Sequence, residues 1–173
     1  MYKLKKNVLK ILKLLHLLAA CCWIGGAASL SVLNLSQRTS DTEGVLYGIN
    51  TASHLIDMWI VVVFGALGCL ITGFLYGLLT NWGFFKHTWL IWKWILTIAA
   101  ILSGTFFLGV WESSMLEMSR EMGQAALQDN AYLSVKTRHL MLSSVQIAAL
   151  IFMVWLSVFK PWGKKADSKK TQN

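Results

Sequence analysis

Four long apolar stretches dominate the chain and restrict what it can fold into. They cover approximately residues 14–34, 55–79, 88–111 and 139–159. Each exceeds the roughly 18 apolar residues that indicate a membrane-crossing helix. Only helices and closed barrels satisfy their backbone hydrogen bonds in lipid, and barrel strands are shorter and alternate in hydrophobicity. The sequence therefore predicts an all-α polytopic membrane protein, a single domain of residues 1–173 that forms a four-transmembrane-helix bundle.

The composition supports a membrane protein and argues against a nucleic-acid-binding one. Hydrophobic residues make up 55% of the chain and the mean hydropathy is +0.54, more than a soluble domain of this size can bury. The net charge is +8, but its charges gather in tails and loops, a pattern typical of contact with lipid headgroups. We expect the lipid bilayer as partner and no nucleic acid; a homo-oligomer or a membrane partner is left open.

The distribution of lysine predicts the direction of the spans. Basic tails of approximately residues 1–13 and 160–173 carry five lysines each, and the short turn after the second span contains Lys86 without an acid. Most acidic residues lie in the two longer loops. Because cytoplasmic loops are enriched in Lys and Arg, we expect both termini in the cytoplasm.

The first apolar stretch also resembles a signal peptide, since lysines precede it and Leu18-Ala19-Ala20-Cys21 looks like a lipoprotein cleavage box. A lipoprotein would turn polar after that cysteine, whereas this sequence stays apolar through Leu33. We therefore expect the stretch to be retained as the first span. Cys21, Cys22 and Cys69 all fall in apolar segments and predict no disulfide framework.

Small residues and methionines suggest how the bundle packs. Glycines line the second span at Gly65, Gly68, Gly73 and Gly77, the last two forming a GxxxG that allows close helix contact. Methionines recur at helical spacing within residues 112–130 and predict a short amphipathic helix on the outer surface. Their thioethers suit Cu(I), although such a stripe is more often the apolar face of a helix.

Ionisable residues inside apolar spans are costly in lipid and are candidate functional residues. His16 lies about one turn inside the first span, so its imidazole should point into the bundle and either hydrogen-bond to a neighbour or bind a ligand. Lys93 lies just over one turn inside the third span, where snorkelling to the headgroups is the alternative interpretation.

A second group of polar residues lies near the opposite membrane surface. His54 and His139 each open a helix there, close to Asp57, Glu112 and Arg138. An ion pair of Asp57 with Arg138 or His139 is one interpretation. The other is a pair of imidazoles facing across the bundle, as in haem b sites between helices. His16, His54 and His139 are thus the candidate metal or haem ligands.

Several catalytic signatures are absent from the sequence: it contains no Gly-rich phosphate loop, no HExxH, no CxxC and no GxSxG. Catalytic residues stay unknown, and whether the chain is an enzyme is left open.

Two helix starts resemble those of a known group of membrane proteins. Leu14-Leu15-His16, followed by Trp23-Ile24-Gly25-Gly26, resembles the first helix of CopD/HemJ-like proteins, which include copper-resistance membrane proteins and the HemJ-type protoporphyrinogen oxidase. Trp89-Leu90-Ile91-Trp92-Lys93 looks like the Trp-Leu-x-x-Lys start of a HemJ-type helix. The whole chain is most similar to an uncharacterised bacterial four-helix integral membrane family, a domain of unknown function in that broad group.

The resemblance implies a location in the bacterial plasma (inner) membrane, with His16 as a haem ligand and Lys93 as a partner of a haem propionate or of substrate. The leading hypothesis is a protein that binds haem b within the bundle for redox or haem handling. One alternative is a small copper or solute permease-like protein, with copper in place of haem. The other is a structural or accessory membrane subunit whose polar residues only join helices.

Overall fold

The computed structural model describes residues 6–37, 42, 44–79 and 87–161. Its elements are helices, some of them with π or 3-10 geometry. In chain order they are α1 (Lys6–Ser36), α2 (Val45–Leu55), the π-helix η1 (Ile56–Leu67), α3 (Gly68–Leu79), α4 (Thr88–Ser103), the π-helix η2 (Gly104–Leu108), α5 (Gly109–Met122), the 3-10 helix η3 (Gly123–Gln128) and α6 (Asn130–Phe159).

These elements join into four helices that are long and apolar enough to cross a membrane: Asn7–Ser36, Val45–Leu79, Thr88–Gln128 and Asn130–Phe159. The predicted all-α class with four spans is thereby confirmed. Each expected span lies within one of these helices, and α1 also takes in part of the basic N-terminal tail. The ends of both tails and the short turn of residues 80–86 lie outside the described residues.

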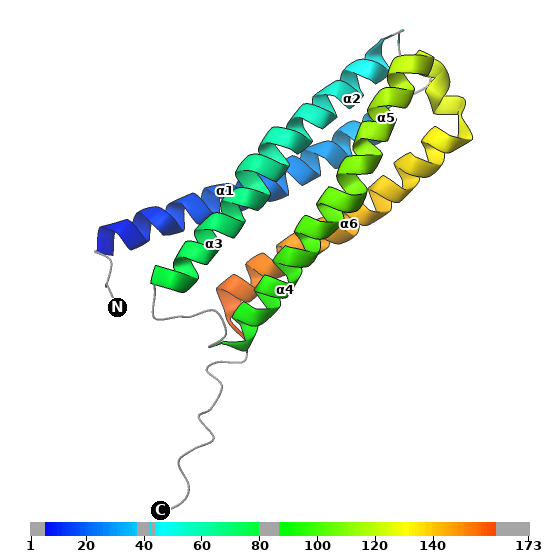
Figure 1. The fold of residues 1–173 in the computed structure, drawn as a ribbon. Coiled ribbons are helices and arrows are strands. Elements are labelled where there is room, and N and C mark those ends of the chain that lie inside the picture. The colour runs from blue at the N-terminus through cyan, green and yellow to red at the C-terminus, as the bar shows by residue number, and fades with distance from the viewer. Residues whose placement is uncertain (1–5, 38–41, 43, 80–86, 162–173) are drawn as a thin grey trace, which may run out of the picture.

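The four spans pair as two antiparallel hairpins that then pack together. α1 packs along η1 and α3, while α6 packs along α4, α5 and α1, and α2 contacts α5. We call the end that holds the start of α1 and the end of α6 the tail end, and the opposite end the loop end. In Figure 1, α1 and α3 diverge from α4 and α6 toward the tail end, whereas the spans converge at the loop end.

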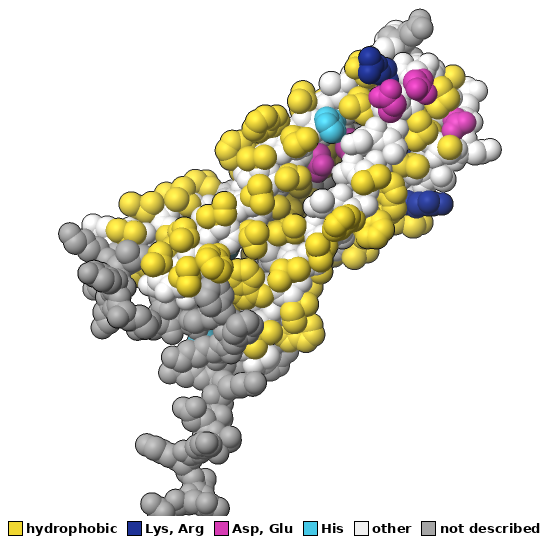
Figure 2. All heavy atoms as spheres, viewed as in Figure 1, with side chains coloured by type: hydrophobic (Ala, Val, Ile, Leu, Met, Phe, Trp, Pro, Cys, Tyr) yellow, Lys and Arg dark blue, Asp and Glu magenta, His cyan; other side chains and the backbone are white. Residues whose placement is uncertain are grey.

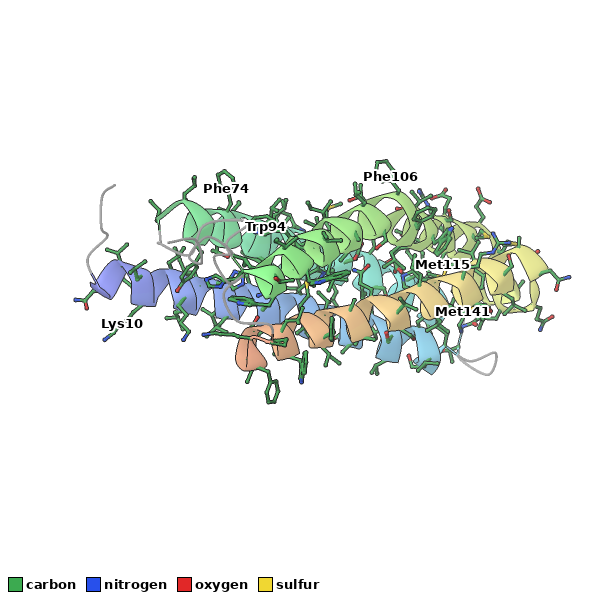
Figure 3. The ribbon with its side chains drawn as sticks, turned by 90° about the horizontal axis from the view of Figure 1, so that it is seen from below. Lys10, Phe74, Trp94, Phe106, Met115 and Met141 are labelled. Atoms are coloured by element: carbon green, nitrogen blue, oxygen red, sulfur yellow. The ribbon has the colours of Figure 1, made fainter. Side chains whose placement is uncertain are left out.

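The sides of the bundle are covered with apolar side chains. Hydrophobic residues spread along the surface in Figure 2, and acidic and basic side chains gather at the loop end. Phe74 and Phe106 point away from the bundle in Figure 3, and Phe106 keeps 66% of its surface exposed. Water would not tolerate so much continuous apolar surface, so lipid is the surrounding solvent.

Glycines bring the first two spans into close contact. The tight approaches lie at Gly65, Gly68 and Gly26, whereas a Cβ on Gly73 of the predicted GxxxG would lie at an ordinary 3.7 Å from Cε1 of His16. A Cβ on Gly65 would lie 2.7 Å from Cα of Trp23, and one on Gly26 would lie 2.7 Å from Cγ2 of Val61. A Cβ on Gly68 would come within 3.0 Å of Cβ of Ala19. Gly25, by contrast, has open space around it. Small residues therefore set the distance between α1 and η1 by removing side-chain bulk from the interface.

Two π-helical segments interrupt the second and third spans at the same level. η1 covers twelve residues and η2 covers five, and the backbone N–H of Gly109 bonds to the carbonyl of Gly104 at the end of η2. π-Helices are rare and occur frequently at functional sites. Hydrophobic periodicity gave no sign of them, because the apolar composition of both segments suits an α-helix equally well.

The segment of residues 112–130 differs from the expected surface helix. It continues the third span as α5 and η3 instead of lying separately on the membrane. Met115 is buried in a cluster with Leu46, Ala126 and Tyr132, and Met118 packs against that cluster. The methionine stripe thus forms the apolar core of the loop end.

The contact between Gly65 and Trp23 is testable. Gly65→Ala should destabilise the protein by about 1–3 kcal/mol, because the new methyl group meets backbone atoms that cannot rotate away. Gly25→Ala is the matched control and should be neutral or stabilising, since Ala suits a helix better than Gly. Thermal unfolding in detergent measures both. Equal stability of the two variants would contradict this packing.

Candidate functional site

A closed hydrogen-bond network joins the four spans at the loop end. Gln37 Nε2 donates to Asn50 Oδ1 at 2.8 Å, and Asn50 Nδ2 donates to Tyr132 Oη at 3.1 Å. The Tyr132 hydroxyl donates to Gln37 Oε1 at 3.0 Å, and Asn50 Nδ2 also reaches the Met115 carbonyl at 3.2 Å. All three polar side chains are buried and mutually paired, so we interpret the network as structural.

On the tail side of this network, His139 lies between the side-chain amide of Asn34 and the carboxylate of Glu112. Asn34 Nδ2 is 3.3 Å from His139 Nδ1, and His139 Nε2 is 3.3 Å from Glu112 Oε2. Since the amide nitrogen carries hydrogens, Nδ1 accepts, and the ring proton on Nε2 is donated to Glu112. His139 is 3% exposed and Glu112 is 2% exposed. Both ring nitrogens of His139 are therefore engaged within the protein.

Asp57 and His54 lie on the second span beside this pair. Asp57 lies close enough to His54 and to Glu112 for electrostatic interaction with either side chain. A Cβ placed on Gly109 would lie 4.0 Å from Asp57 Oδ2, so the carboxylate approaches α5 one turn before Glu112. Arg138 is exposed. The predicted residues thus gather near the loop end. The carboxylate that His139 contacts is Glu112, whereas no contact of His139 with Asp57, Arg138 or a second imidazole is seen among the described residues.

A cavity of about 100 Å³ separates the spans next to Asp57 and His139. Ser143 and Gln146 from α6 add polar groups, and residues of η1 and η2 line much of the remainder. Pockets for drug-sized ligands measure roughly 300–1,000 Å³. This cavity accommodates a few water molecules and is too small for a porphyrin.

His16 lies in the tail half of the bundle, held against α3. Its Nδ1 is 2.7 Å from Thr72 Oγ1, and the Thr72 hydroxyl lies 2.6 Å from the Gly68 carbonyl. Since that hydroxyl has a single proton and donates it to Gly68, His16 Nδ1 must carry the ring proton. The lone pair of Nε2 is left available, and it makes no hydrogen bond within the part of the chain that the structure describes.

Lys93 occupies the same half of the molecule. Its Nζ donates to Ser157 Oγ on α6 at 2.7 Å, and its charge interacts with His16 and Cys69. The ammonium group is therefore held by a neighbouring span and does not only reach toward headgroups. His16 and Lys93 thus lie in the same half of the bundle, and the shared site that the resemblance implies stays a prediction.

A preformed metal site is not seen in the described ranges. Across residues 6–37, 44–79 and 87–161, no three His, Cys, Asp or Glu side chains come together closely enough to hold a metal ion. Cys21 is exposed, and Cys22 and Cys69 are partly buried free thiols.

The helices and polar residues described above agree with the family to which the sequence can be matched. Residues 10–161 match the family described as "predicted integral membrane protein (DUF2269)". The chain belongs to this family. No curated protein and no solved structure matches it. The DUF2269 match confirms the similarity to an uncharacterised membrane family, whereas the wider CopD/HemJ link stays a prediction.

Sequence reasoning placed Glu112 near the loop end of this DUF2269 protein but did not select it as a site residue. The available signal was an acid directly after Trp111, at the expected end of the third span. Because the third span continues to Gln128, Glu112 lies well inside a helix that crosses the membrane. The helix continues beyond the end that hydropathy predicted, and there Glu112 packs against His139 of α6, which helps to bury the carboxylate.

The loop-end network of the DUF2269 protein provides a stability test. Tyr132→Phe should lower the free energy of unfolding by about 1–3 kcal/mol, because buried amide groups of Gln37 and Asn50 lose their partner. Tyr47→Phe is the control, since Tyr47 is an exposed tyrosine on α2. Denaturant unfolding in detergent compares them. A Tyr132 variant as stable as the control would show that the network contributes nothing.

Proposed function

We propose that this protein binds haem b in the tail half of the bundle, with His16 as an axial ligand, for redox or haem handling. The observation that supports the proposal is the hydrogen bond from His16 Nδ1 to Thr72, which leaves the Nε2 lone pair available. Histidines that bind metals usually donate the other ring N–H to an acceptor, which orients the ring.

Lys93 adds the complementary charge that a haem propionate requires. Its ammonium group interacts electrostatically with His16 and is held by Ser157, so it is positioned near the candidate ligand. His16 does not line the cavity between the spans, and that cavity is too small for a porphyrin. The proposal therefore places the macrocycle outside the cavity.

Haem b, when bound, supplies one-electron chemistry, and its potential depends on the axial ligand, hydrogen bonding and burial. The chain's own contribution would be to orient the ligand through Thr72 and to bind a carboxylate through Lys93. The described contacts provide one oriented imidazole, since both nitrogens of His139 are engaged. His16 is therefore the residue that would hold the haem iron.

The test is an absorption spectrum of detergent-purified protein from haem-supplied cells, oxidised and then reduced with dithionite. We expect a Soret band with resolved α and β bands when reduced. His16→Ala should abolish these bands, and Thr72→Val should weaken haem affinity by about 10–100-fold, because it removes the orienting acceptor.

His54→Ala is the control and should retain the spectrum, since His54 lies in the loop half. A flat visible spectrum of the wild-type protein, or an unchanged spectrum of the His16 variant, would refute the proposal.

A small copper or solute permease-like role is the second candidate. The feature that favours it is the cavity between all four spans, which carries Asp57, Ser143 and Gln146 among apolar residues. In that case Cu(I) or a small solute, and not haem, should raise the melting temperature of the protein, because a ligand stabilises the folded state that binds it.

We also propose that both termini face the cytoplasm of a bacterial plasma membrane. The start of α1 and the end of α6 lie at the same end of the bundle (Figure 1), and lysines are concentrated in the flanking tails. A fluorescent protein fused after Asn173 should therefore be fluorescent, and an alkaline phosphatase fused there inactive. An active phosphatase would place the tails outside.

A further inference from the structure

Five buried side-chain atoms have no hydrogen-bond partner among the described residues. They are Glu112 Oε1, Asn34 Oδ1, His54 Nδ1, Trp23 Nε1 and Gln124 Oε1. Trp23 lines the cavity and is 3% exposed. Each unpaired buried group costs about 1–3 kcal/mol, and a charged oxygen costs more. Glu112 bonds to His139, which lines the cavity, so its unpaired oxygen lies close to the cavity wall.

The charges of this region do not balance. Asp57 and Glu112 interact with each other electrostatically, and no Lys or Arg forms an ion pair with either in the part of the chain described. His139 donates its Nε2 proton to Glu112 while its Nδ1 accepts from Asn34, which is the arrangement of a neutral imidazole. Among the described residues, the carboxylates therefore have no Lys or Arg that compensates their charge.

The groups that face Glu112 come from the spans packed on α5. Asp57 lies on the second span, beside His54. His139 and Tyr132 lie on α6, and the Tyr132 hydroxyl bonds to the neutral amides of Gln37 and Asn50. An isolated buried carboxylate loses several kcal/mol of solvation, and proteins usually relieve this by protonating the group.

We propose that Glu112, Asp57 and His139, together with the cavity beside them, form a proton-binding site inside the membrane. One proton is held by the two carboxyl groups, chiefly on Glu112 Oε1, and exchanges through water in the cavity. Glu112 Oε2 keeps the hydrogen bond from His139. Binding adds one proton and one positive charge, and release to cavity water removes them, so no other reactant is needed.

The site is independent of the haem proposal, because it uses other residues in the other half of the bundle. The proton-binding site would also give the π-helical segments η1 and η2 a chemical function. η1 contributes Asp57 to the cavity wall, and η2 ends immediately before the turn that carries Glu112. The two irregular segments thus lie where the proton would be bound.

The first test is labelling of the full chain in membranes with dicyclohexylcarbodiimide, an apolar reagent for protonated carboxyl groups. The carboxylic O–H adds across a C=N bond and the acyl group migrates to nitrogen, so the adduct contains every atom of both reactants. Peptide mass spectrometry should find the adduct on Glu112 at neutral pH, with a yield that falls as the pH rises.

Glu112→Gln should lose this adduct, whereas Glu117→Gln should keep it, because Glu117 is an exposed acid on the same helix. Suppression of labelling by Na⁺ at constant pH would overturn the proposal in favour of a cation site.

Infrared difference spectroscopy provides a second measurement that does not depend on reagent access or on a variant that folds. Exposed carboxyl groups are ionised at pH 7. The wild-type protein should nevertheless show a carboxylic acid C=O band at that pH, which disappears on alkaline titration and is absent from Glu112→Gln. A wild-type spectrum without this band at neutral pH would overturn the proposal.

Discussion

The absence of water from the bilayer core is the constraint on which this structure depends. Each polar group placed there must find its partner inside the protein, and most of them do. Thr72 and Ser157 accept from His16 and Lys93 in the tail half, while Gln37, Asn50 and Tyr132 satisfy one another at the loop end. These bonds also connect spans that hydrophobic contact alone would hold weakly, because lipid competes for apolar surfaces.

The buried polar atoms that make no hydrogen bond among the described residues say more about function than the paired ones. Glu112 Oε1 and Trp23 Nε1 are buried and have no hydrogen-bond partner in the part of the chain that the structure describes, and Trp23 lines a small cavity. A structural subunit would gain stability by replacing such groups with apolar residues of similar volume, since a buried ion pair is often no more stable than its hydrophobic equivalent. The arrangement therefore supports a role that requires polarity, and an exchangeable proton is the smallest ligand that accounts for it.

Much of the fold could be predicted because hydropathy and small-residue spacing are local properties. The four spans and the close approach at Gly65 and Gly68 followed from them. Helix rotation could not be predicted, because it depends on the neighbouring spans: Gly26 packs against Val61 while adjacent Gly25 faces open space. The same limitation explains why the sequence left His139 paired with either Asp57 or His54, whereas its contacts are Asn34 and Glu112.

The two polar regions lie in opposite halves of the bundle, and the residues between them limit how they can communicate. Gln146 binds Ser103, and Thr97 donates to the sulfur of Met153, so weak polar contacts continue from the cavity toward Lys93. Trp23, Ala66 and Ala100 close the apolar core around them. A continuous water path would need a shift of these packed side chains. Electrons do not need such a path, so a redox centre near His16 and a proton site at Glu112 can interact through charge alone, and burial in a low dielectric strengthens that interaction.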